Sequence, residues 1–160
     1  MTDPLREATI HAALAAAVAD VLESMFFIET LGESSEAPEE QAIAVEIRFE
    51  GDPPGVFQLR LTPDAAESIA TNFLGEDAGA VSPRQTSDVA LELANMICGA
   101  VLSRLESSAC FRLDSPRMVV AGELGEAEAT RITVETGDGK LTAAIQLEGR
   151  TCPATAEYVS

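Results

Sequence analysis

The chain has 160 residues, of which 46% are hydrophobic and 23% are charged, and its formal net charge is −17 at pH 7. This length suits one domain with a hydrophobic core, and the balance of apolar and charged residues is that of a globular protein. A surface this acidic repels a phosphate backbone, so nucleic acids and anionic membranes are excluded as expected partners.

The apolar runs, the N-terminus and the cysteines indicate whether the protein is expected to span a membrane, to be secreted or to bind a metal. No run reaches the ~18 uninterrupted apolar residues that span a bilayer, and the N-terminus is acidic where a signal peptide is basic. The three cysteines, Cys98, Cys110 and Cys152, are odd in number and lack CxxC spacing, which fits reduced thiols. With His11 as the only histidine, we expect no metal site. We therefore expect a cytoplasmic protein with a single domain, 1–160.

The first expected element is a long helix with an N-cap at Thr2 and an end near Phe27. Its alanine-rich middle, 12–19, allows close packing against another element. His11 lies among these alanines, where a surface or interfacial place is favoured over a chemical one. The next segment, Gly32–Glu40 (GESSEAPEE), has no periodicity and is predicted to be an acidic, solvated loop.

Two strands are expected next. Apolar residues alternate with Ala44, Glu46 and Arg48 along Ala42–Phe49, which predicts a half-buried strand. A turn rich in glycine and proline follows, and Val56–Leu61 is expected to return as the second strand of a hairpin.

A shorter helix, Ala65–Leu74, is expected after this hairpin. We expect Thr62, Pro63 and Asp64 to cap its start and Gly75 to end it. Capping also accounts for Asp64 and Glu67, two carboxylates near a helix N-terminus.

The segment Ser87–Leu105 (SDVALELANMICGAVLSRL) is the most informative of the chain. It contains no proline and is predicted to be a helix, with Ser82 and Pro83 as its start signal. At about 100° per residue, its polar residues share a stripe ~80° wide. That stripe consists of Asp88, Glu92, Asn95, Gly99 and Ser103. Because nearly all other positions are apolar, we expect a buried helix whose polar stripe reaches water or a partner.

Strands are expected again after this helix, at Phe111–Leu113, Met118–Ala121, Arg131–Glu135 and Leu141–Leu147. The sequence Gly-Asp-Gly at 137–139 predicts a hairpin turn between the last two. The order of elements indicates an α+β fold with two related halves, each a helix followed by antiparallel strands.

The spacing Asp88-x3-Glu92-x2-Asn95, followed by Met-Ile-Cys-Gly, resembles the signature of the CheC/CheX/FliY chemotaxis phosphatases, and CheX-like domains in particular. The resemblance implies an antiparallel sheet packed with two long helices in a pseudo-duplicated arrangement. In family members with two active sites, the first helix carries a second copy of the motif. Here Glu23 is followed three residues later by Phe26, so we expect one site per chain.

The resemblance also implies a function. The chain would hydrolyse the aspartyl phosphate of a CheY-type response regulator, in chemotaxis or a related two-component pathway. Glu92 would dock onto the lysine of the receiver, and Asn95 would orient the attacking water. Asp88 and Gly99 would contact the partner, which could approach closely at the glycine. The protein needs no cofactor of its own, since the receiver holds Mg²⁺, and CheX-like proteins suggest a homodimer.

Other interpretations stay open on the sequence alone. Carboxylate and amide groups on the edge of a buried helix are often simply solvated. The domain could also dock a receiver or another signalling protein without turnover, or be a flagellar-switch component related to FliY. No phosphate-binding loop and no Ser-His-Asp arrangement offers a rival active site.

Overall fold

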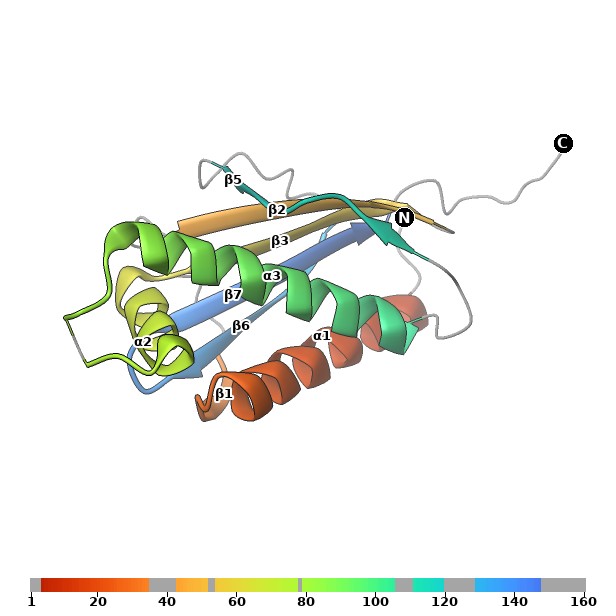
Figure 1. The fold of residues 1–160 in the computed structure, drawn as a ribbon. Coiled ribbons are helices and arrows are strands. Elements are labelled where there is room, and N and C mark those ends of the chain that lie inside the picture. The colour runs from red at the N-terminus through yellow and green to blue at the C-terminus, as the bar shows by residue number, and fades with distance from the viewer. Residues whose placement is uncertain are drawn as a thin grey trace, which may run out of the picture.

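One antiparallel sheet carries a layer of helices on one face (Figure 1). The computed structural model describes residues 4–34, 43–51, 54–77, 79–105, 111–119 and 129–147. The helices are α1 (Pro4–Met25), α2 (Pro63–Leu74) and α3 (Pro83–Leu105). The strands are β1 (Thr30–Glu33), β2 (Ile43–Glu50), β3 (Gly55–Leu61), β4 (Arg112–Leu113), β5 (Arg117–Val119), β6 (Thr130–Thr136) and β7 (Lys140–Leu147).

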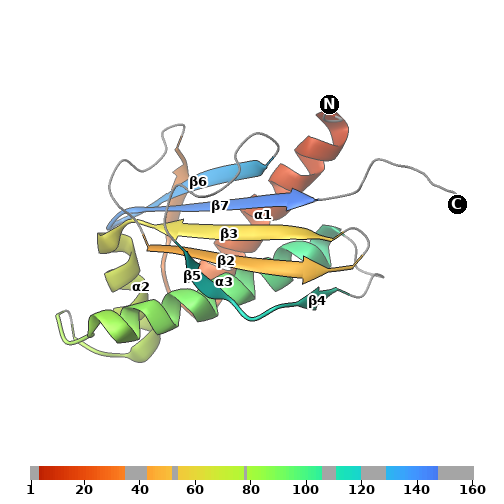
Figure 2. The same ribbon diagram turned by 90° about the horizontal axis from the view of Figure 1, so that it is seen from above.

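The order of strands in the sheet reveals two matching halves. The order is β1-β6-β7-β3-β2-β4, and β5 also pairs with β2 (Figure 2). The hairpins β2–β3 and β6–β7 therefore meet at the centre, where β3 pairs with β7. On the outside, β1 pairs with β6, and β5 pairs with β2. Each half thus pairs a strand that follows its long helix with the hairpin of the other half, and the predicted helix-plus-strands duplication is confirmed.

The hydrophobic core lies between the sheet and the two long helices. Alternate residues of β2 and β3 point into it, such as Val45, Ile47 and Phe57, each fully buried. Leu14 on α1 and Leu93 on α3 meet them from the helical layer, and both are fully buried as well. Burying such a side chain contributes about 1.5–3 kcal/mol. Core packing therefore fixes the position and rotation of α3.

The opposite face of the sheet is more closed than the sequence predicts. Ala44 is 1% exposed and Glu46 is 8% exposed, so the prediction of a half-buried strand is wrong for this part of β2. The Glu46 carboxylate accepts a hydrogen bond from Gln58 Nε2 at 3.4 Å and pairs with the Arg117 guanidinium on β5. Because these neighbours satisfy the charge, the glutamate can be buried without a large desolvation penalty.

The ends of the helices follow local signals, with one exception. Ser82 Oγ accepts a hydrogen bond from Gln85 N at 3.1 Å, and Ser82 N donates to Gln85 Oε1 at 2.8 Å, so a capping box begins α3. Gly75 ends α2 with a φ of 69°, as expected. Thr62, however, makes no capping hydrogen bond with its side chain. Its hydroxyl instead accepts a hydrogen bond from Lys140 N at 3.0 Å and joins α2 to the start of β7.

The predicted loop from Gly32 is also corrected. Gly32 and Glu33 belong to β1, and Ser34 N donates to Thr133 O at 2.7 Å. This pairing with β6 creates a short strand that has no periodicity of its own. The rest of the predicted acidic loop lies outside the described residues. The same is true of Thr2, Ala42, Cys110, Cys152 and residues 120–121.

The first helix has an apolar composition that serves the core. By length and hydropathy alone, Glu7–Met25 could cross a membrane. Its apolar face is nevertheless packed in the fold: Leu14, Ala17, Val18 and Leu22 are fully buried. At the surface, His11 Nε2 lies 3.1 Å from Glu33 Oε1 and links α1 to β1. The interfacial place expected for His11 is confirmed.

Candidate functional site on α3

The polar stripe of α3 is the surface that the fold leaves open on this helix. Asp88, Glu92, Asn95 and Ser103 are exposed, and Gly99 is partly exposed. The other faces of the helix are buried by Val89, Ala90, Leu93, Ala94, Ile97, Cys98, Val101 and Leu102. A helix held on most sides in this way presents its remaining side chains from a rigid support.

The three motif side chains are unpaired within the part of the chain that the structure describes. Among the residues that the structure describes, Asp88, Glu92 and Asn95 make no side-chain hydrogen bond or ion pair. Their spacing of four and three residues places them one above another on the same helical face. Two carboxylates and an amide are therefore available to an outside partner.

Gly99 leaves room one turn beyond Asn95. A Cβ atom built at this glycine would meet no atom within 4 Å, so the space above the helix is open. The glycine is therefore not required by internal packing. It lowers the stability of the helix by about 1 kcal/mol relative to alanine, and no side chain protrudes from the surface at this position beside the Asn95 amide.

Cys98 lies beside these residues in sequence but belongs to the core. The thiol is fully buried, and this burial raises the pKa of Cys98 to about 12. A thiol that stays protonated at neutral pH is a poor nucleophile. Cys98 is thus a packing residue.

The first helix does not repeat the site. Phe26, which stands where a second motif would place asparagine, is fully buried and stacks on Phe73 with ring centroids 4.7 Å apart. Glu23 is exposed, and its carboxylate accepts a hydrogen bond from Thr30 Oγ1 at 3.2 Å. The first helix therefore lacks the asparagine of a second motif, and the residue in its place is buried in the core.

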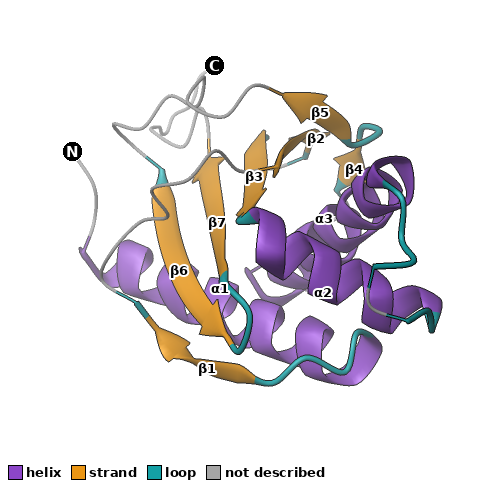
Figure 3. Ribbon diagram, turned by 90° about the vertical axis from the view of Figure 1, so that its left-hand side faces the viewer, coloured by secondary structure: helices purple, strands orange, loops and turns teal. Residues whose placement is uncertain are grey.

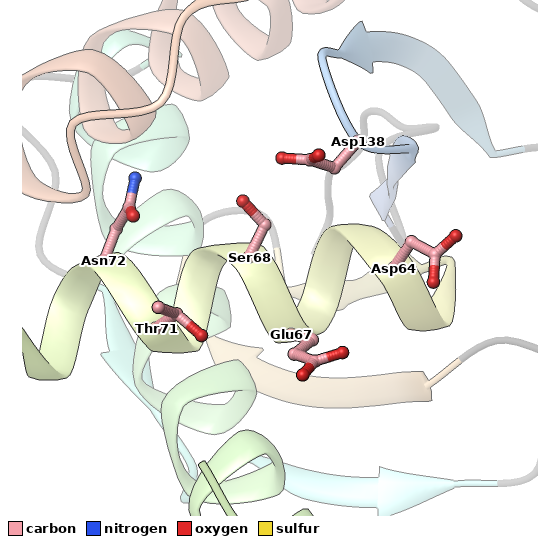
Figure 4. A pocket seen from close by; sticks show the side chains of 6 residues that line it. All are labelled: Asp64, Glu67, Ser68, Thr71, Asn72 and Asp138. Atoms are coloured by element: carbon pink, nitrogen blue, oxygen red, sulfur yellow. The ribbon is translucent and has the colours of Figure 1, made fainter. Parts of the chain in front are cut away.

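Apart from the stripe on α3, a hollow that the sequence does not predict lies along α2 (Figure 4). It measures about 400 Å³ and is lined by Asp64, Glu67, Ser68, Thr71, Asn72 and Asp138. Asp64 lies in the first turn of α2, where its negative charge suits the helix dipole as expected, and neither Asp64 nor Glu67 makes a side-chain hydrogen bond with a described residue. No local signal places Asp138 beside α2, because the β6–β7 turn reaches it only through the tertiary fold.

Comparison with known families decides the affiliation. The sequence profile described as "Chemotaxis phosphatase CheX" matches residues 43–136, more than half of the chain. The chain belongs to the CheX family. The match begins at β2 and ends with β6, and it includes the whole of α2 and α3. A comparison with curated proteins finds no match.

Solved CheX structures share the fold. CheX from Desulfovibrio desulfuricans superposes with a TM-score of 0.71 at 20% identity, covering 87% of this chain and 99% of that one. CheX from Vibrio vulnificus gives 0.71 at 21% identity and covers 89% and 98%. A chain of the CheX–CheY–BeF3–Mg complex from Borrelia burgdorferi gives 0.66 at 14% identity and covers 85% and 96%. These likenesses confirm the predicted α+β fold.

Proposed function

We propose that this protein is a phosphatase that hydrolyses the aspartyl phosphate of a CheY-type response regulator. The observation that carries the proposal is the exposure of Glu92 and Asn95 on the rigid helix α3, where neither side chain is bonded to another described residue. Membership of the CheX family supports it, as does the similar Borrelia burgdorferi protein, which was crystallised in complex with CheY.

The chemistry of the two residues fits the reaction. An aspartyl phosphate is a reactive acyl phosphate, and hydrolysis needs a water molecule in line with the phosphorus. Phosphoryl transfer depends chiefly on positioning and electrostatics, so a fixed amide can provide the missing element. The Asn95 amide has both a donor and an acceptor and orients that water without taking its proton.

Glu92 provides the docking contact in this proposal. It lies one turn before Asn95, and its carboxylate would pair with the active-site lysine of the receiver. Asp88 and Gly99 extend the contact along the same stripe, where the open space above the glycine admits the partner. The receiver supplies the Mg²⁺, so the chain needs no metal of its own.

The decisive experiment measures how fast a phosphorylated receiver loses its phosphate in the presence of Mg²⁺. We expect wild-type protein to accelerate the decay and Asn95→Ala to lose the acceleration by about 10²-fold, as for other positioned amides. Ser103→Ala, on the same stripe two turns away, is the matched control and should remain active. If wild type binds several receivers without accelerating decay, the domain is instead a non-catalytic docking module.

A further inference from the structure

An apolar surface at the far end of the helical layer contributes nothing to the site on α3. It consists of Met25, the last residue of α1, Phe27 shortly after it, and Phe73 and Leu74 at the end of α2. Figure 3 shows these two helices. We refer to these four residues as the apolar seam. Their exposed fractions are 49% for Met25, 74% for Phe27 and 38% for each of the other two. The stacked rings of Phe26 and Phe73 join the two helix ends beneath the seam.

Phe27 is presented by an unusual backbone conformation. Its φ is 58°, in the left-handed region that glycine or asparagine usually fills after a helix. Ile28 N donates to Leu22 O at 3.0 Å, and Asn72 Nδ2 donates to Phe27 O at 3.3 Å, so both helices hold the turn in place. An unfavourable backbone that displays a phenyl ring to solvent is typical of a functional contact.

Carboxylates line two hollows that adjoin the seam. Glu23 and Glu29 line a hollow of about 240 Å³ together with Phe27 and Ile28. Asn72, next to Phe73 in the chain, lines one end of the hollow along α2, and the carboxylates of that hollow, Asp64, Glu67 and Asp138, lie further toward the N-terminus of the helix (Figure 4). Within the described ranges, none of these five carboxylates forms an ion pair. The seam therefore adjoins two hollows whose carboxylates form no ion pair with a described residue.

The negative charge near the apolar seam indicates which kind of partner would bind there. A second copy of the chain would bring carboxylates against carboxylates, which is unfavourable. We propose that the apolar seam binds a segment of a different protein in which an apolar side chain is flanked by lysine or arginine. The apolar group would cover Phe27 and Met25, and the cations would enter the two acidic hollows.

The test uses a synthetic helical peptide that carries a leucine stripe flanked by lysines, with binding followed by fluorescence anisotropy. We expect Phe27→Asn and Met25→Gln each to weaken binding about tenfold, because each removes a buried apolar contact. Asparagine suits a left-handed φ, and glutamine suits a helix end, so both variants should fold. Met118→Ser, which removes an exposed apolar side chain from β5, should bind the peptide like wild type.

The charge is tested separately. The double variant Glu23→Gln/Glu29→Gln should weaken binding of this peptide and reduce its salt dependence. A peptide with glutamates in place of the lysines should not bind. The proposal is overturned if the seam variants bind like wild type or if Met118→Ser weakens binding equally, since either result means general attraction to an acidic surface. It is also overturned if wild type self-associates and Phe27→Asn abolishes that association.

Discussion

The two long helices begin the two halves of the fold, yet they present different surfaces. On α3, Asp88, Glu92 and Asn95 are exposed at a spacing of four and three residues. On α1, one turn before the register in which Phe26 takes the place of the asparagine, exposed positions with the same spacing hold Ala16, Asp20 and Glu23. The α1 series thus has a shorter carboxylate in the second place and a carboxylate instead of an amide in the third.

The two carboxylates of this α1 series, Asp20 and Glu23, are also hydrogen-bonded within the protein. Asp20 Oδ2 accepts a hydrogen bond from Arg104 Nη2 at 3.3 Å, which ties α1 to the last turn of α3. Glu23 is bonded to Thr30. The motif side chains of α3 have no such partners among the described residues. The comparison teaches that α3 presents its whole motif free for a partner, whereas the corresponding stripe of α1 takes part in bonds within the fold.

The largest expected effect comes from forcing the motif onto α1. Phe26→Asn restores the spacing Glu-x2-Asn, but it replaces a fully buried ring that stacks on Phe73. We expect the free energy of unfolding to fall by about 3–5 kcal/mol, the usual cost of truncating a buried phenylalanine. Urea denaturation measures this change. Asn95→Ala on the exposed stripe should stay within about 0.5 kcal/mol of wild type.

A stable Phe26→Asn variant with additional phosphatase activity would contradict this view of α1. It would mean that the position can leave the core and that the two helices are interchangeable. A strongly destabilised Asn95→Ala variant would be equally damaging, because it would make the α3 stripe a structural feature.

The contrast between the helices also shows what the sequence predicts well. Long periodic segments are predicted correctly, because the burial of Leu93 and Ile97 repeats every three or four residues. The start of α3 and the end of α2 follow from Ser82 and Gly75, whose effects are local. For the same reason, the exposed stripe of α3 can be predicted from its spacing.

The features that the sequence does not predict depend on contacts between distant segments. β1 exists because Thr30–Glu33 pairs with β6, and its four residues carry no pattern. Glu46 is buried because Gln58 and Arg117 stand beside it on neighbouring strands. The sequence indicates only the end of a helix near Phe27, since nothing local demands a positive φ at a phenylalanine.

The next effect concerns the docking carboxylate. Glu92→Gln keeps the shape of the side chain and removes its charge, so the pair with the receiver lysine would be lost. We expect the affinity for a phosphorylated receiver to fall about tenfold, since a hydrogen bond to a charged group contributes about 1.5–3 kcal/mol. Isothermal titration calorimetry measures the change. The control is Glu7→Gln, which removes an exposed carboxylate from α1 and should leave the affinity unaltered. Equal losses of affinity in both variants would mean that Glu92 acts only through the net charge of the protein and not through a specific contact.

A smaller effect distinguishes the buried face of α3 from its exposed one. Burial raises the pKa of Cys98 to about 12 in the folded protein, from an ordinary value of 9.0 for a solvated thiol. Between these values the unfolded chain loses the proton and the folded protein keeps it, so stability falls as pH rises above about 9. At pH 10 the loss is about 1.4 kcal/mol. Chemical denaturation at pH 7 and pH 10 should show this loss in wild type but not in Cys98→Ala. If the difference in free energy of unfolding between the two proteins is the same at both pH values, the thiol lies near solvent.

The smallest effect tests why α3 keeps a glycine at its exposed face. Because a Cβ at Gly99 would touch nothing, Gly99→Ala should stabilise the protein by about 0.5–1 kcal/mol in urea denaturation. Gly99→Leu should fold equally well but fill the space beside Asn95 and weaken receiver binding. Ser103→Leu, one turn further on, provides a control of similar bulk. If Gly99→Leu binds the receiver like wild type, the open space is not used. If binding is lost only at Gly99, the glycine is retained for access by the partner, at a cost in stability that the exposed face of α1 does not bear.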